Sequence, residues 1–139
     1  IVIAGKGSME NELRMRIKEF GVGDRVELAG FVSDKELVDL YAGALGVVYA
    51  PFDEDYGYVT LQAFAAGKPV ITAHDSGGTL EWVDDGVTGS VTDGSPEQIA
   101  AAIDGLAGSP STAVRQGATG HDRVRDLDWG RVVAALIAP

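Results

Sequence analysis

Short apolar runs alternate along this chain with longer stretches in which apolar residues recur every three or four positions. The first run, IVIAG at residues 1–5, predicts a buried strand, and residues 9–20 have the spacing of an amphipathic helix. The pattern then predicts strands at 25–29, 46–50, 69–73 and 89–92, and helices at 33–44, 58–66 and 79–84. Strands that alternate with helices predict an α/β fold, in which helices cover both faces of a parallel sheet.

Capping signals indicate where several helices begin. Ser33 and Glu36 have the S-x-x-E spacing of a capping box. A second helix start is predicted at Ser95, which is a suitable cap. Pro96 follows at the first helical position, and Gln98 is the polar partner at the third.

The tail after residue 95 is predicted to be helical. Asp128 is a suitable cap for a last helix at 129–137, and the Ser-Pro pairs and the GATG sequence at 117–120 predict that the tail breaks into short helices. Trp82 and Trp129 are predicted to be core residues of helices.

Composition narrows the class of protein. The 139 residues fit a single domain, and the net charge of −10 leaves no basic patch for nucleic acid. No apolar run approaches the roughly 20 residues of a membrane span. The chain has no cysteine, which excludes disulfides and thiolate chemistry and fits a cytoplasmic location.

The stretch PFDEDYGYVTLQAFAAGKPVIT, residues 51–72, carries the strongest functional signal. An acidic loop with Glu54 follows a strand, and Gly57 then opens a helix. Open α/β sheets bind ligands at the carboxyl ends of their strands. A carboxylate accepts hydrogen bonds from sugar hydroxyls, and a helix N-terminus binds phosphate. Together these features predict a site for a nucleotide-sugar.

Other candidate residues have an ordinary structural explanation beside the functional one. Phe31 and Val32 follow a strand and either border a ligand or pack within the loop. Lys6, in a Gly-Lys-Gly turn, is a candidate phosphate ligand or a surface lysine, and Gly77 and Gly78 line a cleft or form a turn.

Two further features are weak candidates for chemistry. His74 follows a strand but has no partner in sequence, so we expect an ordinary loop residue. The acidic triplet at 53–55 lacks the spaced partners of a metal site, so no metal is predicted.

The segment EDYGYVTLQAFAAGKPVI, residues 54–71, resembles the signature E-x-F-G-x-x-x-x-E-A-M-A-x-G-x-P-V-I of the family 4 (group 1) retaining glycosyltransferases. The likeness covers nearly the whole chain, through IVIAGKGS, GDRVELAGFVSDKELVDLYAGA, SGGTLEWVDDGVTG and DWGRVV. It implies a Rossmann-like, three-layer α/β/α domain with a parallel sheet, which forms one half of a GT-B glycosyltransferase.

The resemblance also implies roles for residues. Glu54 would be the catalytic residue that holds the donor sugar, and the backbone of Gly57, Tyr58 and Val59 would bind the diphosphate. Phe31 and Val32 would border the base, and Lys6, Gly77 and Gly78 would line the substrate site. No metal and no cofactor is implied besides the nucleotide-diphosphate sugar that serves as donor.

Gln62 departs from the signature, because the family has a second Glu at this position that accepts the ribose hydroxyls. An amide offers one acceptor and one donor group. We therefore expect nucleotide binding weaker by about 1 kcal/mol, or alternatively a tolerated polar exchange on a helix.

The resemblance assigns residues 1–139 to a partial C-terminal, donor-binding domain. We expect the N-terminal acceptor domain and a first strand, with a basic loop for the diphosphate, to lie outside this chain, and the chain alone to be inactive. The intact enzyme would transfer a hexosyl group with retention. Membrane association through its other parts stays open. The alternatives are a non-catalytic nucleotide-sugar-binding or interaction module and, with less support in the motif, a nucleotide-sugar epimerase.

Overall fold

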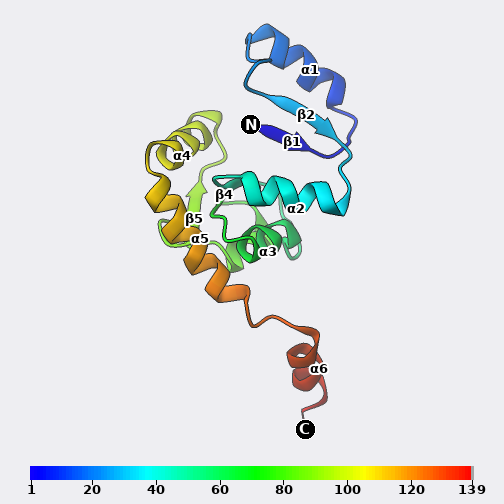
Figure 1. Ribbon diagram of the computed structural model, residues 1–139, viewed down its shortest axis with the longest axis vertical. Coiled ribbons are helices and arrows are strands. Elements are labelled where there is room, and N and C mark those ends of the chain that lie inside the picture. The colour runs from blue at the N-terminus through cyan, green and yellow to red at the C-terminus, as the bar shows by residue number, and fades with distance from the viewer. Residues whose placement is uncertain (139) are drawn as a thin grey trace. The chain divides into compact units, whose positions relative to one another are not determined.

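The computed structural model describes residues 1–138 and divides into two compact units (Figure 1). The first unit comprises Ile1–Leu40, and the second begins at Tyr41. Each unit is described by itself below. Among the helices of the described part, none combines the length and apolar character needed to cross a lipid bilayer.

The first unit contains a pair of parallel strands joined by a helix. Strand β1 (Val2–Ala4) leads through helix α1 (Glu10–Glu19) to strand β2 (Glu27–Gly30), and Ile3 of β1 lies opposite Leu28 of β2. A parallel pair needs such a crossover, which a helix supplies. The predicted strand, helix and strand are therefore confirmed as elements, with β2 shifted toward the C-terminus. The expectation that the first strand is buried was wrong, because in the described structure every residue of β1 is exposed and the strand pairs with β2 alone.

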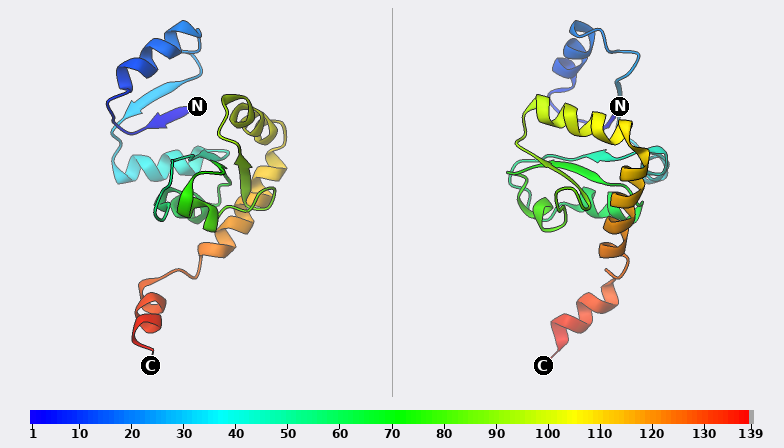
Figure 2. Two further views of the ribbon diagram at one scale, coloured as in Figure 1. Left: turned by 180° about the vertical axis from the view of Figure 1, so that it is seen from behind. Right: turned by 90° about the vertical axis from the view of Figure 1, so that its left-hand side faces the viewer.

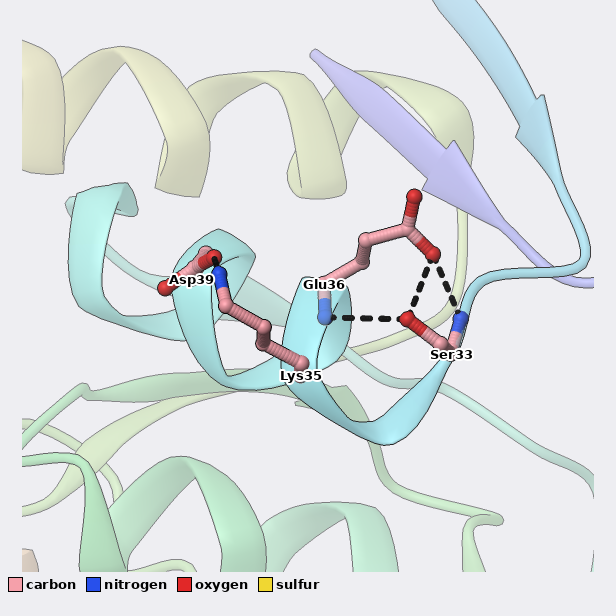
Figure 3. A network of polar contacts seen from close by, with 4 residues as sticks. All are labelled: Ser33, Lys35, Glu36 and Asp39. Carbon is pink, nitrogen blue, oxygen red and sulfur yellow. Dashed lines mark hydrogen bonds and ion pairs between the residues drawn. The ribbon is translucent and has the colours of Figure 1, made fainter.

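Helix α2 (Asp34–Gly43) begins at the predicted capping box (Figure 3). Glu36 Oε2 accepts hydrogen bonds from the backbone N–H and the hydroxyl of Ser33, both at 2.7 Å, and Ser33 Oγ accepts from the Glu36 N–H at 3.3 Å. These bonds from Ser33 lower the pKa of Glu36, because they stabilise the charged carboxylate. Lys35 and Asp39 add an ion pair of 2.8 Å on the exposed side of the helix.

The second unit is built on three parallel strands in the order β3-β4-β5. Val47 of β3 lies opposite Val70 of β4, which in turn lies opposite Gly89 of β5. Every residue of β4 is buried, as expected for the central strand of a parallel sheet with both faces covered. The bounds are Val47–Val48 for β3, Val70–Ala73 for β4 and Gly89–Thr92 for β5.

Helices cover both faces of this sheet (Figure 2). On one face, Val70 packs with Phe64 of α3 (Tyr58–Ala65) and Val124 of α5 (Pro110–Val124). On the other face, Ile71 packs with Leu106 of α4 (Pro96–Gly108) and with Ala113 at the start of α5. Because neighbouring strand residues point to opposite faces, the sheet forms the middle of three layers. The predicted three-layer parallel α/β class is confirmed.

The predicted caps of the later helices are also present. Ser95 Oγ accepts a hydrogen bond from the Gln98 N–H at 3.3 Å at the start of α4. Asp128 Oδ1 accepts from the Arg131 N–H at 2.9 Å at the start of α6 (Trp129–Ile137). The segment predicted as a short helix at 79–84 is a 3₁₀ helix, η1 (Gly77–Glu81).

The expectation that GATG would break the tail was wrong, because α5 continues through both glycines to Val124. Packing explains their presence. A Cβ at Gly120 would lie 2.5 Å from Cδ1 of Phe64, and a Cβ at Gly117 would meet the carbonyl oxygen of Gly67. The two glycines let α5 approach α3 and its following turn more closely than any other residue would allow.

The assignment of Trp129 to the core was also wrong, since 82% of its surface is exposed in the described structure. Trp82, in contrast, packs against the cluster formed by Phe64, Val70 and Val83.

Candidate functional site

The acidic loop after β3 is fixed at its backbone by the turn that follows β4. The N–H of Asp53 donates to the carbonyl of Asp75 at 2.9 Å, and the N–H of Gly78 donates to the carbonyl of Glu54 at 2.6 Å. Asp53 itself adopts a positive φ of 48°, which Asp tolerates better than most residues. The loop therefore holds a defined path and presents Glu54 in a half-buried position.

Gly77 and Gly78 pack directly against the backbone of this loop. A Cβ at Gly77 would lie 2.5 Å from the carbonyl oxygen and 2.7 Å from the nitrogen of Glu54, and a Cβ at Gly78 would meet the carbonyl of Asp55. Gly77 also has a φ of 58°, where side chains are disfavoured. These glycines contact the backbone around Glu54; that they also line a substrate cleft stays a prediction.

The Glu54 side chain has a partner that the sequence did not single out. The hydroxyl of Tyr49 donates a hydrogen bond to Glu54 Oε2 at 2.8 Å. Burial, followed by this bond and the negative charge of Glu54, raises the pKa of Tyr49 to about 12. Tyr49 therefore stays protonated and donates a hydrogen bond to the carboxylate at any physiological pH.

The N-terminus of α3 lies three residues after Glu54. Gly57 caps the helix with a φ of 76°, and a Cβ there would lie 2.8 Å from Thr79 Oγ1. The first turn contains no acidic residue, and within residues 1–138 no hydrogen bond from outside the helix engages the N–H groups of Tyr58 and Val59. Such free N–H groups carry the positive end of the helix dipole and suit an anionic ligand.

Gln62 lies on α3 five residues beyond Gly57 and is exposed. Its Oε1 accepts a hydrogen bond from the hydroxyl of Tyr41 at 3.1 Å. Burial raises the pKa of Tyr41, so this hydroxyl also stays protonated. With its carbonyl oxygen engaged by Tyr41, Gln62 keeps its NH₂ group for another partner.

Lys6, Phe31 and Val32 belong to the first unit and are described within it. Lys6 is one of the residues that line a pocket of about 230 Å³ beside β1, β2 and the start of α1. Phe31 is 76% exposed, directly after β2, and Val32 is half-buried. Their participation in one site with Glu54 stays a prediction.

The sequence around the acidic loop contains few positive charges. Between residues 49 and 79 the sequence has one lysine, Lys68, whose ammonium donates to the carbonyl of Ala42 at 3.0 Å. His74 is an exposed loop residue. Among residues 1–138, no three His, Cys, Asp or Glu side chains gather in a group that could hold a metal ion.

Tyr49 and Tyr41 are the site residues that sequence reasoning missed. Tyr49 had one usable signal, since it is a polar aromatic residue at the end of the apolar run GVVY, five positions before Glu54. Tyr41 had none, because it precedes Gln62 by 21 residues and lies in a different element.

Known proteins share both the sequence and the fold of this chain. It is 38% identical to the GDP-mannose-dependent alpha-(1-6)-phosphatidylinositol monomannoside mannosyltransferase of Mycobacterium tuberculosis, over 98% of the chain and 37% of that protein. It is 33% identical to the human alpha-1,3/1,6-mannosyltransferase ALG2, over 83% of the chain and 27% of that protein. The chain thus spans between about a quarter and just over a third of these relatives.

A solved structure supports the same grouping. The sucrose-phosphate synthase of Thermosynechococcus elongatus superposes with a TM-score of 0.85 at 25% identity, over 97% of this chain and 36% of that one. The sequence model of the family described as "Glycosyl transferases group 1" matches residues 1–123. The chain therefore belongs to the group 1 glycosyl transferases, with the GT-B type of fold.

Proposed function

We propose that the protein containing this chain transfers a hexosyl group from a nucleotide-diphosphate sugar to an acceptor with retention of configuration, and that this chain binds the donor. One observation carries the proposal: the loop after β3 places Glu54 three residues before Gly57, where α3 begins with free N–H groups. A sugar diphosphate needs both an acceptor for its hydroxyls and donors for its phosphates.

The relatives support the choice of donor. One is named a GDP-mannose-dependent mannosyltransferase and another a mannosyltransferase, and each is more than 30% identical to this chain. We therefore propose a nucleoside diphosphate carrying a hexose as the donor class. The other partner of this chain would be an acceptor-binding domain of the same enzyme.

In the proposed mechanism, the bond between the sugar and the diphosphate breaks as the acceptor hydroxyl attacks from the same face. Negative charge then grows on the leaving diphosphate, and one of its oxygens takes the proton that the acceptor hydroxyl loses. The N–H groups of Tyr58 and Val59 would stabilise that charge, because they are already oriented toward the space before the helix. Glu54 would orient the sugar by accepting hydrogen bonds from its hydroxyls, and in this proposal it forms no covalent bond to the sugar.

The scarcity of cations beside this loop adds a requirement. A diphosphate carries more negative charge than two backbone N–H groups neutralise, and the loop itself contributes three acidic residues at 53–55. We therefore propose that cationic groups from outside residues 49–79 complete the diphosphate site.

Donor binding and product analysis test the proposal. Titration of the full-length protein with UDP, GDP, UDP-glucose and GDP-mannose should show one nucleotide that binds, with tighter binding of its sugar conjugate. Glu54→Ala should remove the gain from the sugar and keep the affinity for the bare nucleotide. Transfer from that donor to an acceptor should give a product whose anomeric configuration, read by proton NMR, equals that of the donor. Binding without turnover would instead favour a non-catalytic nucleotide-sugar module, and an inverted product would refute retention.

A further inference from the structure

Glu54 is held by its side chain as well as by its backbone. The Tyr49 hydroxyl bonds to Glu54 Oε2 at 2.8 Å, and Oε1 makes no hydrogen bond to any residue that the structure describes. A carboxylate can accept about four hydrogen bonds. One oxygen of Glu54 is therefore engaged by the protein, and the other is free for a ligand.

Tyr49 is well suited to fix another group. Its N–H donates to the carbonyl of Ile71 at 2.9 Å, which continues the pairing of β3 with β4 by one residue. Its ring packs against the core cluster that contains Phe64 and Val70. Both the backbone and the ring of Tyr49 are thus fixed by the sheet and the core, so the position of its hydroxyl is set before any ligand arrives.

We infer that Tyr49 is a positioning residue that fixes the Glu54 carboxylate so that its free oxygen receives the donor sugar. This inference rests on the proposed function. A glutamate side chain has several rotatable bonds, and ordering it costs free energy that would otherwise be paid when the sugar binds. A fixed carboxylate avoids that cost, which is the advantage of a preorganised site.

The backbone contacts of the loop make the role of Tyr49 separable. The hydrogen bonds from Gly78 to Glu54 and from Asp53 to Asp75 do not involve Tyr49. In the variant Tyr49→Phe, the loop should therefore keep its path while the Glu54 carboxylate loses its fixed orientation. The ring remains, so packing in the core should change little.

The test compares a nucleoside diphosphate with its sugar conjugate on the full-length protein. Calorimetric titrations with UDP and UDP-glucose, and with GDP and GDP-mannose, give the gain in affinity that the sugar provides. In Tyr49→Phe, this gain should fall about threefold to tenfold, while affinity for the bare nucleotide stays within twofold of wild type. Adding Tyr49→Phe to Glu54→Ala should cause no further loss, because Tyr49 acts through Glu54.

Tyr41→Phe is the matched comparison, because it removes a hydroxyl of the same kind from the tyrosine that bonds to Gln62. Because Gln62 is predicted to face the ribose, Tyr41→Phe should change the affinity for nucleotide and conjugate by the same factor and so leave the gain from the sugar intact. A purely structural role of Tyr49 would lower the affinity for nucleotide and conjugate by the same factor, or change neither, and either result would overturn the inference.

Two further outcomes keep the proposals apart. A wild-type protein that binds nucleotide and conjugate equally would refute the proposed function, and the positioning role with it. A wild-type gain that depends on Glu54 but persists in Tyr49→Phe would refute the positioning role alone. If Tyr49→Phe does not fold, wild type and Glu54→Gln are compared by titrating ¹³C-labelled tyrosine. The pKa of Tyr49 should fall below about 12 in Glu54→Gln, because the negative charge of Glu54 is lost, and stay above its ordinary value, because burial remains; an unchanged pKa would overturn the inference.

Discussion

Replacing Gly77 with alanine should displace the loop that carries Glu54. The new Cβ would lie 2.5 Å from the carbonyl oxygen and 2.7 Å from the nitrogen of Glu54, and both are backbone atoms that no rotamer change can move. Gly77 also has a φ of 58°, which costs an alanine roughly 1–2 kcal/mol. Overpacking typically adds about 1–3 kcal/mol. We therefore expect Gly77→Ala to lower the free energy of unfolding by about 2–5 kcal/mol.

Gly67→Ala separates the two contributions. Gly67 has a similar φ of 68°, but a Cβ there would find no atom within 4 Å. This variant should lose about 1 kcal/mol, from backbone strain alone. Urea unfolding would be followed by the fluorescence of Trp82 in a Trp129→Phe background, because Trp82 packs on the core whereas Trp129 is exposed.

The comparison has a clear refuting result. If Gly77→Ala and Gly67→Ala lose the same free energy of unfolding within about 0.5 kcal/mol, Gly77 does not pack against the backbone of Glu54 as closely as the distances indicate. A second readout is donor binding, since a displaced Glu54 should also reduce the gain in affinity from the sugar in Gly77→Ala and not in Gly67→Ala.

Three further variants test other contacts. Gly120→Ala should destabilise the protein by about 1–2 kcal/mol in urea unfolding, because its Cβ would lie 2.5 Å from the Phe64 ring and the clash should exceed the gain in helix propensity. The stability that the Tyr49 phenol contributes should be fully present below about pH 10 and lost as pH rises toward 12, since its folded pKa is about 12; the advantage of wild type over Tyr49→Phe should therefore shrink between about pH 10 and 12. Gln62→Glu should tighten nucleoside diphosphate binding by about 1 kcal/mol, measured by calorimetry, because a carboxylate can accept from Tyr41 and from both ribose hydroxyls.

Each variant has a control or a contrary outcome. The loss in Gly120→Ala should diminish when Phe64 is shortened to Leu, and an equal loss in both backgrounds would argue against the ring contact. A constant difference between wild type and Tyr49→Phe across this pH range would contradict the raised pKa of Tyr49. For Gln62→Glu, a gain that is the same for ribose and 2′-deoxyribose nucleotides would show that Gln62 does not face the ribose.

Local signals in the sequence were sufficient for most of the fold. The Ser33–Glu36 box and the Asp128 cap act within three or four residues, so their side chains find the same partners in the structure as the spacing indicates. The buried run before Ala73 likewise needs no distant information, because only the central strand of a parallel sheet is apolar on both faces.

The failures share a different cause, which is contact between distant segments. In the sequence, Gly117 and Gly120 have the pattern of helix breakers. In the structure they permit close packing, because Gly67 lies against Gly117 and Phe64 lies against Gly120. The candidate site shows the same division. Glu54 and Gly57 stand out in one short stretch, whereas the bond from Tyr41 to Gln62 joins residues 21 positions apart. No local pattern marks such a pair.

The close contact between α5 and α3 bears on how this enzyme family can be recombined. Val124 of α5, together with Gly117 and Gly120, forms the surface against which helix α3 and its following turn rest. A chimaera that exchanged donor specificity by transplanting only the segment from β3 to β5 would place α3 against a foreign α5. A segment exchanged between relatives should therefore include α5 and end after Val124. Hybrids with a crossover at Ser109 should fold poorly, because they separate α3 from its own α5.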